Sequence, residues 1–172
     1  QFLCSPVIGS ASDAIGRRKI ILIALFALSI DYLILGFSQT LWVLIVGRIV
    51  AGVAGGTVPT ATAYLADISA PSERTKNFGI IGAAFGVGFI MGPALGGILG
   101  EFSSRAPFFL SAILTAFNFI LGYFVLPESL GFENRRPFTL MSANPFLTIW
   151  RAFLFKKLRV PLICFFIISV AH

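Results

Sequence analysis

Long apolar stretches, separated by short clusters of charged residues, run through most of the chain. Three intervals carry no charged residue and contain 18, 24 and 22 residues; they are residues 49–66, 77–100 and 106–127. An α-helix rises about 1.5 Å per residue and the hydrocarbon core of a bilayer is about 30 Å thick, so about 20 apolar residues cross it once. The pattern predicts four complete membrane-spanning helices, at residues 20–37, 42–66, 78–100 and 108–126.

The composition agrees with an all-α membrane protein. Of the 172 residues, 57% are hydrophobic and 12% are charged, whereas about 25% of the residues in a soluble domain are charged. Too few polar side chains remain to cover a surface in water, which excludes a soluble globule and a disordered chain. The alternating pattern of a membrane barrel strand is absent, and hydrocarbon cannot satisfy free backbone groups, so the spans are expected to be helices.

Neither end of the sequence forms a complete span. The first residues are apolar and lead into a polar loop, without an initiator Met or the basic region of a signal peptide. Residues 161–172 are apolar but too short to cross a bilayer. We expect a fragment with partial helices at both ends.

The formal net charge of +6 is explained by topology rather than by nucleic-acid binding. Eleven of the 13 basic residues fall in three segments on one side of the predicted spans, at residues 17–19, 74–76 and 135–159. The opposite loops contain only Arg105. Because Lys and Arg are enriched in cytoplasmic loops, the basic side is predicted to be cytoplasmic, and no nucleic-acid partner is expected.

The sequence offers no arrangement typical of an enzyme. Cys4 and Cys164 are far apart in the sequence, and each lies among apolar residues, so both are interpreted as small hydrophobic residues. The single histidine, His172, is the last residue. Neither a Cys/His metal cluster nor a Ser/His/Asp constellation can be assembled from these residues. We expect no catalytic residues and no metal site.

Two charged residues interrupt the apolar spans. Each costs about 2.5–3.5 kcal/mol at the centre of a bilayer on insertion scales, so such residues usually serve a pathway through the membrane. Asp31 lies six residues before the end of its predicted helix, and Arg48 lies six residues after the start of the next. In an antiparallel hairpin both side chains would lie about 9 Å from the same end. We expect them to share a polar interior, as a direct ion pair or across a water-filled cavity; the alternative is a pair that only holds the hairpin together.

The span at residues 42–66 contains residues that interrupt a helix, namely Gly52, Gly55, Gly56 and Pro59. It also carries polar side chains, which are Thr57, Thr60, Thr62 and Tyr64. A polar face on a spanning helix usually looks toward protein or a cavity. Gly52, Thr60 and Tyr64 are therefore candidates, with Asp31 and Arg48, for proton coupling or the substrate pathway.

The span at residues 78–100 is rich in glycine. Gly88, Gly92, Gly96 and Gly100 recur every four residues, which places a groove on one helix face where another helix can approach closely. Pro93 lies within this face and removes a backbone donor, so a kink or hinge is expected there. Simple tight packing is the alternative interpretation.

The segment at residues 9–19 has the most specific local pattern. Gly9 and Gly16 are expected to allow a tight turn between helices, with Asp13 between them and a basic triplet after them. Asp67 emerges on the same side. We expect Asp13 to meet the positive end of another helix and Asp67 to meet Arg17 or Arg18, so that these contacts hold this side shut in one state. A basic triplet that only sets the topology is the alternative.

Three motifs, met in order along the chain, resemble those of the major facilitator superfamily. Residues 9–18 are similar to the loop motif that follows the second helix of that family. Arg48 with Gly52 resembles the fourth-helix motif linked there to proton coupling. Residues 88–97, which include Gly88, Gly92, Pro93, Gly96 and Gly97, are similar to the fifth-helix motif of drug/proton antiporters.

Further stretches resemble the bacterial tetracycline/proton antiporters in particular; they are residues 41–52, 63–68, 106–109 and 126–129. Asp31 and Arg48 fall on positions that this subfamily uses. The resemblance implies two six-helix bundles around a central site that opens alternately to either side, with inverted three-helix repeats in each bundle. On this basis residues 1–126 belong to the N-terminal bundle, from the end of helix two to helix six, and residues 160–172 begin helix seven.

Residues 127–159 are then the cytoplasmic central loop. Apolar residues recur there at helical spacing beside basic ones, which indicates an amphipathic helix on the anionic inner leaflet that begins at Asn144 and Pro145. A plain flexible linker is the alternative.

The resemblance also implies an activity, namely proton-driven efflux of tetracycline-like or other amphipathic drugs. The proton is then the coupling ion, no cofactor is needed, and the substrate can arrive as a metal complex. The implied partners are the lipid bilayer, the drug, protons and the remaining C-terminal half of the same transporter, and the implied location is the bacterial inner (plasma) membrane as a multi-pass protein. The alternatives are import of a sugar or metabolite by the same fold and a non-transporting membrane receptor or scaffold.

Overall fold

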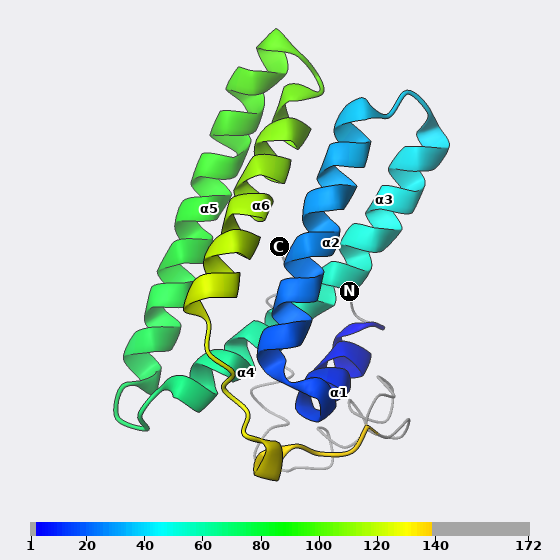
Figure 1. The fold of residues 1–172 in the computed structure, drawn as a ribbon. Coiled ribbons are helices and arrows are strands. Elements are labelled where there is room, and N and C mark those ends of the chain that lie inside the picture. Colours follow the sequence, from blue (N-terminus) through cyan, green and yellow to red (C-terminus); the bar gives the residue numbers. More distant parts are fainter. Residues whose placement is uncertain (1–2, 139–172) are drawn as a thin grey trace.

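The computed structural model describes residues 3–138, apart from the side chain of Asn134, and every regular element in that range is helical. The elements in chain order are α1 (Ser5–Ile15), α2 (Arg17–Phe37), α3 (Leu41–Ala54), η1 (Gly55–Thr57), α4 (Val58–Ile68), α5 (Arg74–Phe102), α6 (Ala106–Val125) and η2 (Phe132–Asn134). Two antiparallel hairpins, α2/α3 and α5/α6, lie next to each other, and α4 crosses beneath α2 to join them (Figure 1).

Four helical stretches in the described range are long and apolar enough to cross a membrane, namely Arg17–Phe37, Leu41–Ile68, Arg74–Phe102 and Ala106–Val125. They confirm the four predicted spans, whose ends lie a few residues away. The described residues bury only four apolar side chains, which are Leu35, Ala54, Tyr64 and Ala112. A helical protein that leaves most of its large apolar side chains exposed suits lipid rather than water. The predicted amphipathic helix and the start of helix seven lie outside the described residues.

The turn between α1 and α2 forms at one glycine, not two. Gly16 has φ +116°, which a side chain would disfavour, and it separates α1 from α2. Gly9 lies inside α1, so the prediction of a two-glycine turn is wrong. Pro6 in the first turn of α1 starts that helix early, and nothing between Pro6 and Gly16 removes a backbone donor.

The long second span is interrupted where glycine and proline predicted it. The 3₁₀ turn η1 separates α3 from α4, and Pro59 lies in the first turn of α4, where its missing N–H costs nothing. Gly52 stays within α3. A Cβ added to Gly56 would lie 2.8 Å from Ile8 Cδ1 and 3.2 Å from the backbone nitrogen of Ser5, so η1 packs closely on the start of α1.

Most basic residues of the described range lie at one end of the bundle; Arg48, within α3, and Arg105 do not. The starts of α2 and α5 and the segment after α6 share that end, whereas Arg105 lies at the opposite end, between α5 and α6 (Figure 1). We call it the basic end. The arrangement agrees with the segregation of charge expected from the sequence.

Candidate functional site

Arg17 is the centre of a charged cluster at the basic end. Its Nε atom lies 2.8 Å from Asp67 Oδ2, and its Nη2 atom lies 3.4 Å from Asp13 Oδ1. No described residue accepts a hydrogen bond from the Nε–H group, so the contact with Asp67 is an ion pair without an aligned hydrogen bond. The Arg17 side chain is 13% exposed, which limits screening by solvent. The predicted pairing of Asp67 with Arg17 is confirmed.

Glu128, which follows α6, completes this cluster by capping α2. Its Oε1 atom accepts hydrogen bonds from the backbone N–H groups of Arg17, at 2.9 Å, and Arg18, at 3.4 Å. The first N–H groups of a helix have no partner inside the helix, and Gly16 at the N-cap position has no side chain to offer. A Cβ added to Gly16 would lie 2.5 Å from Glu128 Oε2. The backbone angle therefore requires glycine, and a side chain at this position would also displace the Glu128 carboxylate.

Two more hydrogen bonds tie the segment after α6 to α4. The Ser129 hydroxyl lies 3.3 Å from Asp67 Oδ2, and the Tyr64 hydroxyl donates to the Pro127 carbonyl at 3.0 Å. We define the basic-end cluster as Asp13, Arg17, Asp67, Glu128 and Ser129. It joins α1, α2, α4 and the segment after α6, and sequence reasoning had assigned no site role to Glu128 or Ser129.

Two predicted gate residues have partners in α2 and α6. Asp13 forms an ion pair with Arg17, the first residue of α2, and its contact with the positive end of a helix stays a prediction. Arg18 Nη2 donates to the carbonyl of Tyr123 at 2.6 Å, and the guanidinium lies 5.7 Å from the centre of the Tyr123 ring. Arg18 therefore links α2 to α6 and takes no part in the ion pairs.

Asp31 belongs to α2, and its side chain lies between α2 and α3, where the residue is only 4% exposed. None of the described residues forms a hydrogen bond with its Oδ2 atom. The carboxylate packs against Gly47, because a Cβ placed there would lie 2.8 Å from Asp31 Oδ1 and 2.6 Å from Leu35 Cδ2. The residue also lines a groove of about 600 Å³ between the two helices, and no other described residue of its lining is charged. A buried carboxylate that lacks a partner beside such a space is a candidate for binding a proton or a substrate group.

Arg48 is exposed and forms no ion pair with Asp31 within the described residues, although their charges interact at longer range. The direct ion pair, one of the two predicted forms, is thus not made. The geometry of α3 explains the result: Gly47 faces Asp31, and a helix turns by about 100° per residue, so the next side chain points elsewhere.

The polar face of the interrupted span is partly buried. Thr57 and Thr60 are 9% and 1% exposed, and neither hydroxyl has a partner within the described residues. Gly52 is half-buried. Tyr64 is buried and bonded to Pro127, so its hydroxyl acts as a tether at the basic end.

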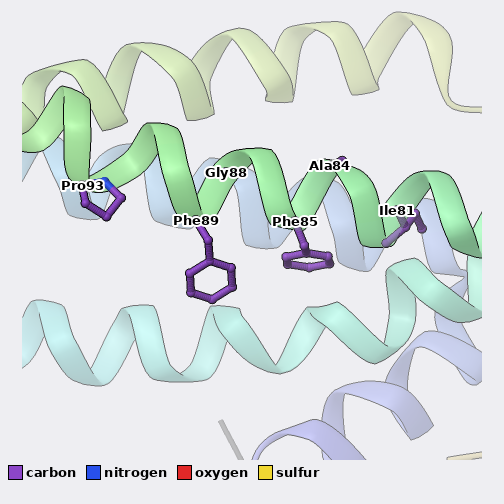
Figure 2. A pocket seen from close by; sticks show the side chains of 6 residues that line it. All are labelled: Ile81, Ala84, Phe85, Gly88, Phe89 and Pro93. Carbon is purple, nitrogen blue, oxygen red and sulfur yellow. The ribbon is translucent and has the colours of Figure 1, made fainter. Parts of the chain in front are cut away.

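The glycine face of α5 is open in the described part of the chain. Nothing lies within 4 Å of a Cβ added at any glycine of the predicted hinge, which are Gly88, Gly92, Gly96 and Gly97. The helix is continuous through Pro93, and none of its residues is buried. Figure 2 shows Phe85 and Phe89 on the same side of α5 as Pro93; with Gly88 they line an apolar groove of about 650 Å³. The close helix approach expected here is not made by the described residues.

Four apolar spans, a buried carboxylate between two of them and a charged cluster at one end define an α-helical, multi-pass membrane protein. The sequence profile of the Major Facilitator Superfamily matches residues 1–172. The chain belongs to this superfamily of membrane transporters.

The chain is similar to two tetracycline resistance proteins of Escherichia coli. It is 47% identical to the class C protein over 145 residues, covering 84% of this chain and 36% of that protein. It is 38% identical to the class B protein over 173 residues, covering 96% of this chain and 41% of that protein. The chain thus spans about two fifths of the length of these relatives.

A solved structure shares the fold. The crystal structure of the human organic anion transporter MFSD10 (TETRAN) matches with a TM-score of 0.72 and 34% sequence identity, over 80% of this chain and 32% of that one. The predicted family and fold class, an all-α superfamily half-bundle, are confirmed.

Proposed function

We propose that the chain is part of a proton-coupled efflux transporter that exports tetracycline-like or other amphipathic drugs by alternating access. The observation that carries the proposal is Asp31, a carboxylate that is 4% exposed inside a span and has one oxygen to which no described residue hydrogen-bonds. An ionised carboxylate in this position is costly, so a bound proton or a substrate cation would relieve the cost. The similarity to tetracycline resistance proteins favours a drug as the substrate.

The basic-end cluster suits a cytoplasmic gate. The Arg17 ion pairs with Asp13 and Asp67 join α1, α2 and α4, so separating these helices requires breaking charged contacts that are only partly exposed. In the proposed cycle these contacts persist while the central site faces outward and open when it faces the cytoplasm. Arg18 and Gly16 support the gate by fixing α2 on α6 and by making room for Glu128.

The open face of α5 suits a moving interface with the remaining C-terminal half of the transporter. Glycines at positions 88, 92, 96 and 97 present no side chain, so another helix can approach and slide along this face, with Pro93 as a bending point. The proton is the coupling ion, no cofactor takes part, and a drug carried as a metal complex is compatible with the proposal. The proposed location is the bacterial inner membrane.

Transport in vesicles that contain the full-length protein tests the proposal. Adding tetracycline to vesicles with an imposed proton gradient should release protons. Asp31→Asn should abolish this release while the protein still inserts, and Asp31→Glu should retain part of it. Glu101→Gln is the matched control, because Glu101 is an exposed acid at the end opposite to the basic end. Full activity of Asp31→Asn would overturn the role of Asp31, and a gradient released by a sugar but not by a drug would overturn the drug substrate.

A further inference from the structure

A shallow groove between α2 and α6 lies on the exposed surface near the basic end. We define the α2/α6 groove by its lining residues, which are Lys19, Leu22, Ile23, Phe26, Phe119 and Tyr123. Its volume is about 400 Å³. Ile23, Phe26 and Tyr123 are more than half exposed. Apart from Lys19 at one end, every residue of the lining presents an apolar or aromatic surface.

The groove runs from the basic end toward the middle of α2 and α6. Lys19 lies in the first turn of α2, and Tyr123 lies in the last turn of α6, so both mark the basic end of antiparallel helices. Phe26 is seven residues further along α2, or about 10 Å deeper. The Phe26 and Phe119 rings lie 5.4 Å apart, and the Phe119 and Tyr123 rings lie 6.4 Å apart. Aromatic side chains thus line the groove over about 10 Å along the helices.

The charge at the mouth of the groove is positive and uncompensated within the described residues. Lys19 is exposed and forms no ion pair there. The guanidinium of Arg18 is fixed beside the Tyr123 ring. The nearby carboxylates are engaged elsewhere, since Asp13 and Asp67 pair with Arg17 and Glu128 caps α2.

We propose that the α2/α6 groove binds one anionic phospholipid of the cytoplasmic leaflet, with its phosphate at Lys19 and an acyl chain over Phe26 and Phe119. Basic residues between spanning helices on the cytoplasmic side bind acidic lipid headgroups. Aromatic side chains such as Tyr123 favour the level at which the headgroups meet the acyl chains. The lipid bridges the two helices that Arg18 already links. This inference rests on the fold alone and is independent of whether the transporter exchanges drugs for protons.

Native mass spectrometry of the purified full-length transporter tests the site. The protein is exposed to phosphatidylglycerol and to phosphatidylcholine with the same acyl chains, and the retained lipid is counted. Lys19→Gln should lower the preference for phosphatidylglycerol about fivefold. Lys76→Gln is the matched control, because Lys76 is an exposed basic residue at the same end but lines no part of the groove. Phe26→Ala should weaken retention of both lipids.

Equal losses in Lys19→Gln and Lys76→Gln would show general attraction to a basic surface and would overturn the site, as would unchanged retention in Lys19→Gln. A label at Ile23→Cys supplies a second measurement. Its fluorescence should be quenched by phosphatidylglycerol with brominated chains more than by the matched phosphatidylcholine, and Lys19→Gln should remove the difference. Disulfide cross-linking of two Ile23→Cys protomers in the bilayer, with no quenching, would show that a second copy fills the groove and would also overturn the proposal.

Discussion

Removing the Glu128 carboxylate should loosen the start of α2 without unfolding the bundle. Its Oε1 atom is the only side-chain acceptor that the described residues offer to the backbone N–H groups of Arg17 and Arg18. Loss of an N-cap acceptor costs about 0.5–2 kcal/mol, and loss of the negative charge at a helix N-terminus accounts for about 0.3–1 kcal/mol of such an effect. Glu128→Ala removes the acceptor of two N–H groups together with the charge, so we expect it to cost about 1–2 kcal/mol, and Glu128→Gln, which keeps an oxygen acceptor, less than about 1 kcal/mol.

Hydrogen–deuterium exchange on the full-length transporter measures this effect locally. A cost of 1–2 kcal/mol raises the population of the open form by a factor of about 5–30. Amide exchange at the start of α2 should therefore increase by about that factor in Glu128→Ala and by less than about fivefold in Glu128→Gln. Peptides from the middle of α5 should be unchanged.

Glu133→Gln is the matched control for this experiment. It removes an exposed acid five residues further along, in η2, that forms no ion pair within the described residues. The reasoning is refuted if Glu128→Ala exchanges no faster than Glu133→Gln at the start of α2. It is also refuted if the increase is the same in α5, because the carboxylate would then stabilise the whole fold and not one helix end.

Three further perturbations follow from the same geometry. Gly47→Ala places a Cβ 2.6 Å from Leu35 Cδ2, so it should lower the free energy of unfolding by about 1–3 kcal/mol, as measured by thermal denaturation. Gly79→Ala is the control and should not lower it, because nothing lies within 4 Å of a Cβ at that position. In a double-mutant cycle, the effects of Arg17→Gln and Asp67→Asn on the free energy of unfolding should be coupled by about 0.2–1 kcal/mol. Additive effects would show that the ion pair between Arg17 and Asp67 does not stabilise the fold. Tyr64→Phe should cost about 0.5–1.5 kcal/mol through the lost bond to Pro127, and an unchanged unfolding midpoint would contradict the tether.

The spans could be predicted because the signal for each lies within one continuous stretch of sequence. A run of about 20 apolar residues fixes where a helix crosses a membrane, and glycine with proline fixes where it is interrupted. The pairing of Asp67 with Arg17 was also within reach, since topology places both at the same end. The direction in which a side chain points around its helix axis could not be predicted in this way. Position along the hairpin places Asp31 and Arg48 at the same depth, but Gly47, and not Arg48, faces the Asp31 carboxylate.

The role of Glu128 has no local signal at all. The carboxylate and the N–H group of Arg17 are 111 positions apart in the sequence. Only the packing of α6 beside α2 brings them together, and that packing depends on small residues such as Gly122 against Leu22. In the same way, the spacing of glycines in α5 predicts a surface for another helix but cannot say which helix covers it.

The distance in sequence between α2 and its cap has a consequence for biosynthesis. A ribosome makes the chain from its N-terminal end, so the first turn of α2 enters the bilayer long before Glu128 has been translated. Until the segment after α6 has been made, Glu128 cannot accept hydrogen bonds from the backbone N–H groups of Arg17 and Arg18. The N-terminus of α2 is therefore capped only after the last described span has been made, so the basic end is completed late in synthesis.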